Sequence, residues 1–427
     1  MSDEHEMSYA RTGSLEGLLQ RGRGLGAVRA LREPQEAAAF VYDGIRRDWR
    51  WDGTDDRCLY LARLVRDLDL SLAPVLRRLA GDEDACLRAC DVLELLALSG
   101  SEAAREGLRA YIGEGVHWAR VLESVAIGWP APWWEDLGDI ARARIGGEAE
   151  PPWMPEPWTR FGIEVPSRPD VPRPSLDGLG TDELLALLRD ERTGDETKFD
   201  ALCALNRREP VEELLPLVPS LGTEDGLRPL PLLRRAVERL DALAVPAARG
   251  WAEDRCPWLA RLGAEVLADH PSPGDLPGLV RELAGQWEAR SWCGPDRTAR
   301  RLARFGPGAA EALPHLRRFW LHTPHSYERT AYLKALAAID PSGLDHVYAE
   351  SLWDCEETAR LTAIASVPAV PETLERIAAL RDDPMETPEV RAAARERLAS
   401  VTAGSTCTGT DTGTGAGTGA GTVTYAS

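Results

Sequence analysis

Apolar side chains recur along this chain at the spacing of helices. The segments 259–267, 309–320 and 344–352 place apolar residues at positions i, i+3, i+4 and i+7 or i+8, which brings them onto one face of a helix. Strict alternation of apolar and polar residues, the pattern of a half-buried strand, is absent between residues 21 and 397. The sequence therefore predicts an all-α fold.

The predicted helices form a repeating unit. Pro273, Pro307 and Pro341 each open a helix at 34-residue intervals, and Pro371 follows 30 residues later. Short turns separate these helices from second helices that begin with Thr-Ala at residues 298, 330 and 358. Short connections favour antiparallel pairs, and a period of this length is typical of a solenoid, in which each pair buries its apolar face against the next pair.

The start of several first helices resembles a known family. Leu313-Pro314-His315-Leu316, Leu276-Pro277-Gly278-Leu279 and Ala73-Pro74-Val75-Leu76 look like the first helix of HEAT-like (armadillo-type) repeats, where a proline sits inside the helix and kinks it. The resemblance implies an α-solenoid of antiparallel two-helix repeats over most of residues 60–147 and 177–400. It is specific for architecture and implies no particular activity.

Changes in composition divide the chain into five regions. The N-terminal residues are polar and glycine-rich, the segment 148–176 contains eight prolines, and the last residues form a Thr/Gly/Ala tract without a core. Trp153, Trp158 and Phe161 predict that part of the proline-rich segment packs on a helical surface. We predict a flexible N-terminus (1–25), an N-terminal helical array (26–147), a proline-rich linker (148–176), a C-terminal helical array (177–400) and a disordered tail (401–427).

Composition also bears on partners and compartment. The net charge of −19, from 50 basic and 69 acidic residues, disfavours nucleic acid and anionic membranes and suits a protein partner with basic segments. The eight cysteines form no CxxC pair, which indicates reduced thiols. The first residues are acidic where a signal peptide is basic, and no apolar run approaches the ~18 residues of a membrane span. We expect a cytoplasmic protein.

The familiar motifs of catalysis are missing. Gly22-Arg23-Gly24-Leu25-Gly26 lacks both the GxGxxG spacing and a preceding strand. The chain contains no GxxxxGK[ST], GxSxG or HExxH. We therefore predict no catalytic residue, no cofactor and no enzymatic activity.

Two groups of residues have metal-ligand chemistry. His315, His322 and His325 are close in sequence, and a zinc site there is conceivable. No cysteine or acidic residue adjoins them in a recognised pattern, so the sequence favours a surface turn and predicts no metal. Cys86 and Cys90 share one helix face, where two small apolar side chains in a core are favoured over two ligands.

Two groups of residues are candidates for binding. Four arginines, at positions i, i+3, i+4 and i+7 of one second helix, would line the concave surface if the HEAT resemblance holds, and could bind anions there. The alternative, which the sequence favours, is a solvated face neutralised by acidic residues of neighbouring repeats. Adjacent Trp133 and Trp134 cannot both face a core, so one of them is expected outside it. The candidate residues are Arg297, Arg300, Arg301, Arg304, Trp133 and Trp134.

These observations favour a non-enzymatic scaffold that binds a protein partner on the concave face of the solenoid. The alternative is a groove enzyme resembling the alkylpurine DNA glycosylases, which would need a basic groove. The four arginines offer one, but no Trp/Asp/Arg set matches that family residue by residue. A resemblance to bilin-lyase-type HEAT proteins rests on the repeat alone.

Overall fold

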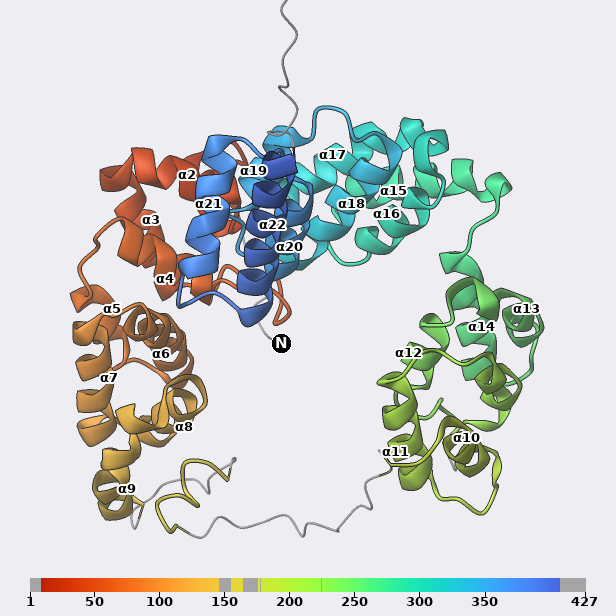
Figure 1. The fold of residues 1–427 in the computed structure, drawn as a ribbon, viewed down its shortest axis with the longest axis horizontal. Coiled ribbons are helices and arrows are strands. Elements are labelled where there is room, and N and C mark those ends of the chain that lie inside the picture. The colour runs from red at the N-terminus through yellow and green to blue at the C-terminus, as the bar shows by residue number, and fades with distance from the viewer. Residues whose placement is uncertain (1–8, 146–154, 164–175, 177, 224, 408–427) are drawn as a thin grey trace, which may run out of the picture. The chain divides into compact units, whose positions relative to one another are not determined.

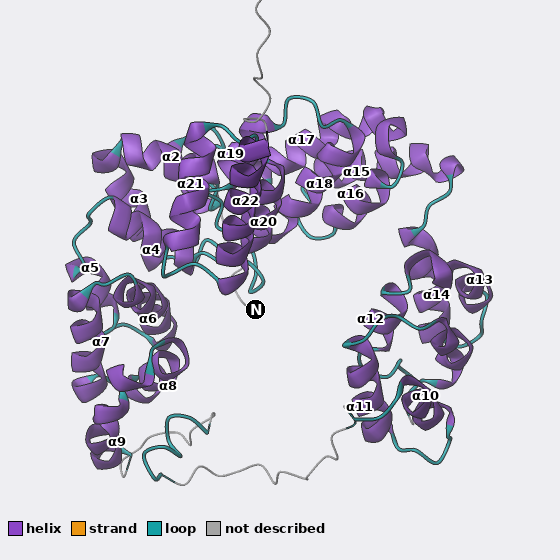
Figure 2. Ribbon diagram, viewed as in Figure 1, coloured by secondary structure: helices purple, strands orange, loops and turns teal. Residues whose placement is uncertain are grey.

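The computed structural model describes residues 9–145, 155–163, 176, 178–223 and 225–407. Across these residues the elements are α-helices and short 3-10 helices, joined by turns and loops (Figure 2). They contain no strand, and the only extended pairing among them is an isolated bridge between Gly222 and Pro229. The all-α prediction is confirmed. Within the described part of the chain, no helix is both long and apolar enough to cross a membrane.

The chain divides into two compact units, and both ends of the sequence belong to the first. Unit 1 comprises Met1–Trp49, Asp56–His117 and Leu344–Ser427. Its helices are α1 (Leu15–Gln20), α2 (Gly24–Arg32), α3 (Pro34–Arg46), α4 (Cys58–Asp67), α5 (Ala73–Arg78), α6 (Glu83–Leu98), α7 (Glu102–Glu114), α19 (Asp345–Ser351), α20 (Glu357–Ser366), α21 (Pro371–Asp382) and α22 (Pro388–Cys407).

Unit 2 comprises Arg50–Asp55 and Trp118–Gly343. Its 3-10 helices include η3 (Glu212–Ser220), η4 (Asp241–Ala244), η5 (Pro273–Asp275) and η6 (Gly306–Ala312). Its α-helices, labelled in Figure 1, are α8 (Trp118–Gly128), α9 (Gly138–Arg144), α10 (Thr181–Arg189), α11 (Asp195–Asn206), α12 (Leu233–Glu238), α13 (Val245–Ala252), α14 (Pro257–Asp269), α15 (Leu276–Glu288), α16 (Pro295–Ala303), α17 (Leu313–His322) and α18 (Arg329–Ile339).

Consecutive helices pack as pairs. In unit 2, α13 contacts α14, α15 contacts α16 and α17 contacts α18, while α16 also contacts α14 and α18. In unit 1, α19 contacts α20, α21 contacts α22, and α20 contacts α22. The predicted second-helix starts at Thr298, Thr330 and Thr358 lie in the first turns of α16, α18 and α20.

The prolines of the first helices occupy a different place from the one the resemblance implied. Pro277 and Pro314 are the second residues of α15 and α17, and a 3-10 turn, η5 or η6, precedes each helix. Pro74 likewise is the second residue of α5. Backbone N–H groups in the first helical turn have no partner within the helix, so proline removes no hydrogen bond there. These prolines therefore begin helices and do not kink them.

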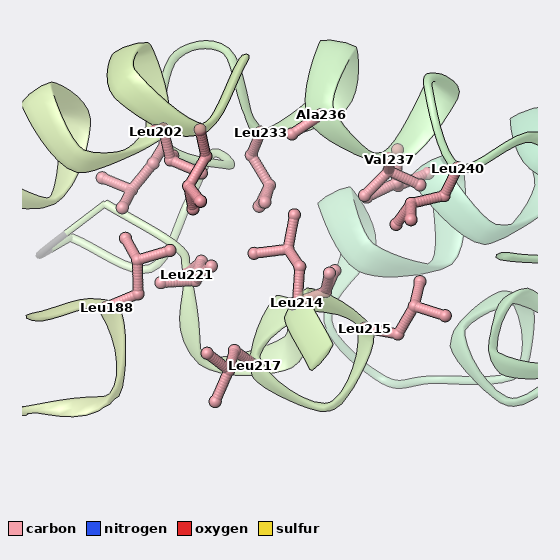
Figure 3. Close-up of a cluster of buried hydrophobic side chains, with 14 of the residues drawn as sticks. Leu188, Leu202, Leu214, Leu215, Leu217, Leu221, Leu233, Ala236, Val237 and Leu240 are labelled. Atoms are coloured by element: carbon pink, nitrogen blue, oxygen red, sulfur yellow. The ribbon is translucent and has the colours of Figure 1, made fainter. Parts of the chain in front are cut away.

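A leucine-rich core fixes the first helices of the 177–343 segment. Leu188 of α10, Leu202 of α11, Leu214 of η3 and Leu233 of α12 are buried in one cluster (Figure 3). Burial of such side chains is the main driving force for folding, at ~25 cal/mol per Å² of apolar surface. Because Leu233 is buried, α12 is held against this core while its next residue, Arg234, stays half-exposed.

Unit 1 is closed by a buried network of ion pairs that joins segments far apart in sequence. The Arg63 guanidinium on α4 donates to Asp383 at 2.8 Å and to Glu386 at 2.7 Å, and all three side chains are buried. Arg360 of α20 donates to both oxygens of Glu386, at 2.9 and 2.8 Å. Residues from the two predicted arrays, 26–147 and 177–400, thus form one unit.

The N-terminal residues have more structure than their composition predicts. The Ser14 side chain caps α1 by accepting from the Gly17 N–H at 3.0 Å. Arg23 is buried and pairs with Glu350 of α19 at 2.6 Å. The expectation of a flexible segment over 1–25 therefore does not hold for residues 14–25, because glycine and arginine here support packing and not solvation.

The proline-rich segment and the tail are described only in part. Trp158 and Phe161 are buried, as expected of aromatic residues that pack on helices. The Trp158 indole donates to Glu123 at 2.8 Å and lies edge-on to Trp118. Trp153 lies outside the described residues, as does the predicted disorder of residues 408–427, whereas α22 continues to Cys407.

Candidate functional site

The four predicted arginines lie on α16 and at its C-terminal cap. Arg297, Arg300 and Arg301 belong to the helix, and Arg304 is the residue that ends it. Ala299 and Leu302, on the opposite face, are fully buried. The buried positions therefore fix the rotation of α16 and turn its arginines outward.

These arginines line a groove with residues of two other helices. Its volume is about 310 Å³. Five arginines face three acidic residues along it. The arginine groove, as we call it, is lined by Arg234 and Glu238 of α12, Glu265 and Asp269 of α14, and Arg297, Arg300, Arg301 and Arg304.

Three of the four predicted arginines are held by ion pairs. Arg300 contacts Asp296, one turn earlier on its own helix, at 2.5 Å. Arg301 reaches Asp269 of α14 at 3.2 Å, and Arg304 reaches Asp241 of η4 at 2.9 Å. Acidic residues of neighbouring helices thus neutralise part of the arginine face, as the second interpretation of the sequence expected.

Arg304 lowers the pKa of two neighbouring groups, Asp241 and His270. Its hydrogen bond lowers the pKa of Asp241, which keeps that carboxylate ionised. Burial lowers the pKa of His270, and the nearby Arg304 guanidinium lowers it further. His270 lies 3.2 Å from Arg304 through Nδ1. A neutral imidazole at this position adds no positive charge to the groove.

Arg297 differs from the other three. Its side chain is exposed, and it forms no ion pair or hydrogen bond with the described residues. Arg300 beside it is 57% exposed, and within the described part of the chain its side chain pairs only with Asp296 of its own helix. Two guanidinium groups in the groove thus present N–H donors to solvent, in the geometry that binds carboxylates in a bidentate manner.

The tryptophan pair is divided as the sequence predicts. Trp134 is buried against Phe161, with the rings edge-to-face at 5.8 Å, and the Arg160 guanidinium lies over it. Trp133 is half-buried and lies against Trp129. These contacts lie within residues 129–161 and involve none of the residues that line the arginine groove.

The predicted surface turn after α17 is instead buried. Thr323, His325 and Ser326 are buried, and the carboxylate of Asp55, 270 residues away, holds the turn in place. One oxygen of Asp55 lies 2.8 Å from His325 Nδ1, 2.8 Å from Ser326 Oγ and 3.0 Å from the Tyr327 nitrogen. The expectation of an exposed turn is therefore wrong, because a distant acidic residue compensates the buried polar groups.

His315 and His322 do not join His325 in a ligand set. The His322 ring packs against Trp287, and His315 Nδ1 is buried without a partner among the described residues. Cys86 and Cys90 are buried in α6, as predicted. The residues that the sequence analysis missed are Asp52, Asp55 and Cys293, which lie near His325 only in the folded chain.

Comparisons of the chain with family models, with curated proteins and with solved structures find no match.

Proposed function

We propose that this protein is a non-enzymatic, HEAT-like interaction scaffold whose arginine groove binds an acidic segment of a protein partner. The packing of consecutive helices in pairs, with α16 in contact with α14 and α18, supports a solenoid of stacked repeats. In such an array, the side chains of successive helices can contact successive residues of an extended ligand. The HEAT assignment rests on this packing and on the 34-residue spacing of Pro273, Pro307 and Pro341, since Pro277 and Pro314 begin helices and do not kink them.

The observation that carries the proposal is the pair of exposed guanidinium groups at Arg297 and Arg300. Arg297 has no partner among the described residues, and Arg300 has only Asp296 of its own helix. Bidentate bonds from arginine to carboxylate are about twice as strong as neutral hydrogen bonds. Carboxylate side chains of a partner would therefore bind more strongly at these two positions than at arginines that are already paired.

The local charge of the groove points to a partner of opposite charge to the one expected from the composition. The net charge of −19 suggests a basic partner, but the groove itself carries five arginines against three acidic residues. Its acidic side chains, Glu238, Glu265 and Asp269, would repel the closely spaced phosphates of a duplex. A peptide with spaced carboxylates places negative charge at the arginines without forcing it against the acidic side chains. Protein is thus favoured over DNA.

Fluorescence anisotropy with a labelled oligoglutamate peptide tests this proposal. The full-length protein should bind the peptide, and added salt should weaken binding. The double variant Arg297→Ala/Arg300→Ala should raise the dissociation constant by about tenfold or more, because two charge-assisted contacts are lost.

The matched control is Arg317→Ala/Arg318→Ala on α17, which removes two exposed arginines outside the groove. Its affinity for the peptide should equal that of the unmodified protein. Equal weakening by both double variants would mean non-specific charge attraction. Tighter binding of oligolysine, or of duplex DNA with a steep salt dependence, would replace the proposal with a basic or a nucleic-acid partner.

A further inference from the structure

A cysteine, an aspartate and a histidine from three distant parts of unit 2 meet beside the buried turn. One ligand atom of each residue, namely Cys293 Sγ, a carboxylate oxygen of Asp52 and a ring nitrogen of His325, lies within 4.8 Å of the other two. Cys293 lies two residues before α16, and His325 follows α17. We propose that Asp52, Cys293 and His325 form a site for a transition-metal ion, with Zn²⁺ the best fit.

A hydrogen bond to Asp55 orients the His325 ring for metal binding. Asp55 is fully buried and accepts from His325 Nδ1 at 2.8 Å. With the proton on Nδ1, the lone pair of the neutral imidazole is on Nε2, the atom that faces Asp52. Histidine ligands of metals are commonly held in this way, by a carboxylate on the other ring nitrogen, which fixes the tautomer and the direction of the ring.

The other two ligands also have supporting hydrogen bonds. The Trp51 indole donates to Cys293 Sγ at 3.0 Å, which suits a sulfur that becomes a thiolate. One oxygen of Asp52 accepts from the Thr54 nitrogen at 2.8 Å and from its hydroxyl at 2.6 Å. The other oxygen lies 3.4 Å from His325 Nε2. Each ligand is thus oriented by a second residue, as in protein metal sites.

The spacing agrees with tetrahedral coordination. With Zn–N and Zn–O bonds of about 2.0 Å, two ligand atoms lie about 3.3 Å apart, close to the 3.4 Å between Asp52 and His325. A thiolate at about 2.3 Å from zinc lies about 3.5 Å from the imidazole nitrogen, within the 4.8 Å limit of the cluster. Small rotations of the Cys293 and Asp52 side chains, both exposed, would complete the geometry.

The chemistry of the three ligands selects the metal. A thiolate, an imidazole and a carboxylate together suit borderline Zn²⁺, whereas Mg²⁺ and Ca²⁺ prefer oxygen alone. Three protein ligands leave one tetrahedral position, which the exposure of Asp52 and Cys293 opens to water. The inference is independent of the arginine groove, although the metal would anchor the residues that precede α16.

Titration of the reduced, metal-free, full-length protein with Co²⁺ tests the site. We expect one equivalent to give the visible absorption of tetrahedral Co²⁺ and a thiolate-to-Co²⁺ charge-transfer band, and Zn²⁺ to displace both. Cys293→Ser should abolish the charge-transfer band, and Asp52→Asn should weaken Zn²⁺ binding, measured by competition with a chelator, at least tenfold.

The two variants change exposed ligands, so that loss of metal binding can be distinguished from loss of folding. Cys293 and Asp52 are exposed, so the variants should fold, which circular dichroism verifies; His325 is buried and is left unchanged. Cys256→Ser, at a half-buried cysteine of the same unit, is the control and should leave the band intact. Absence of a charge-transfer band, or its persistence in Cys293→Ser, would overturn the proposal.

Discussion

At the scale of single residues, buried charges with distant partners join segments that lie far apart in the sequence. Glu386 is fully buried and receives hydrogen bonds from Arg63 and Arg360. Burial raises the pKa of Glu386, but the charges of Arg360 and then Arg63 lower it more, so the net pKa lies below its ordinary value. The same balance, with burial opposed by Arg63 and Arg66, lowers the pKa of Asp383.

Removing one of these charges should destabilise unit 1. Glu386→Gln leaves the buried Arg360 guanidinium without its carboxylate partner and removes one of the two carboxylates that Arg63 contacts. Breaking such a buried pair costs about 3–5 kcal/mol. The free energy of unfolding, measured by urea denaturation at neutral pH, should fall by that amount. Asp382→Asn, which alters only an exposed ion pair with Arg381, should leave it unchanged; equal effects of the two variants would contradict this account.

The pH dependence of stability follows from the same network. Because the pKa values of Asp383 and Glu386 are lowered in the folded state, the unfolded chain binds protons first as pH falls. Their stabilising effect is present above the unfolded values, near 3.8 and 4.5, and is lost as pH falls through the folded ones. In Glu386→Gln, the loss of unfolding free energy on acidification below about pH 4.5 should be shallower.

Residues with partners far away in the sequence could not be placed from local patterns. His325 was expected in an exposed turn because no cysteine or acidic residue adjoins it in a recognised ligand pattern, yet Asp55 contacts it across 270 positions. Cys86 and Cys90, by contrast, were assigned to a core from the spacing within one helix, and they are buried. Helical periodicity reports which face is apolar, whereas pairing of polar groups depends on contacts between elements.

At the scale of elements, the helices could be predicted and the packing of their ends could not. Apolar periodicity and the Thr-Ala starts located α14, α16, α18 and α20. The glycine-rich start of the chain was predicted to be flexible, because glycine disfavours isolated helices. At Gly24 the absence of a side chain lets the first turn of α2 approach the backbone of α19.

Gly24→Ala should therefore be strongly destabilising. A Cβ atom at this position would lie 1.9 Å from the Glu350 carbonyl oxygen, which is backbone and cannot swing away. Overpacking of this kind costs about 1–3 kcal/mol or more, and the urea midpoint should fall accordingly. The control is Gly113→Ala near the end of α7, where a Cβ meets nothing within 4 Å. It should be neutral or stabilising by up to about 1 kcal/mol, since alanine favours helix.

At the scale of the whole molecule, the order of the helices in the sequence differs from their grouping into two units. The proline-rich segment suggested a boundary between residues 26–147 and 177–400, because composition changes there. Unit 1 instead combines the N-terminal helices with α19–α22. Ion pairs such as Arg23–Glu350 and Arg63–Asp383 join these segments, and no local pattern reveals which distant partner each arginine has.

A cut between the two units in the sequence tests this grouping. A protease site inserted between Ser342 and Gly343, in an exposed turn, would separate residues 343–427 from the rest of the chain. After cleavage under native conditions, this fragment should co-elute with the remainder on size exclusion, because the buried Arg63, Asp383 and Glu386 side chains still pair across the cut. A fragment that elutes alone would contradict the assignment of both ends to one unit.

The same cut protein shows whether the ion pairs are what retains the fragment. Once cleaved, the two pieces form a complex whose stability depends on concentration, so urea should separate them at a lower concentration than that which unfolds the intact chain. Glu386→Gln should lower that concentration further, since it weakens contacts across the cut, whereas Asp382→Asn should not. If Glu386→Gln left the separation unchanged, association would depend on apolar helix packing, and the buried charges would act only within each piece.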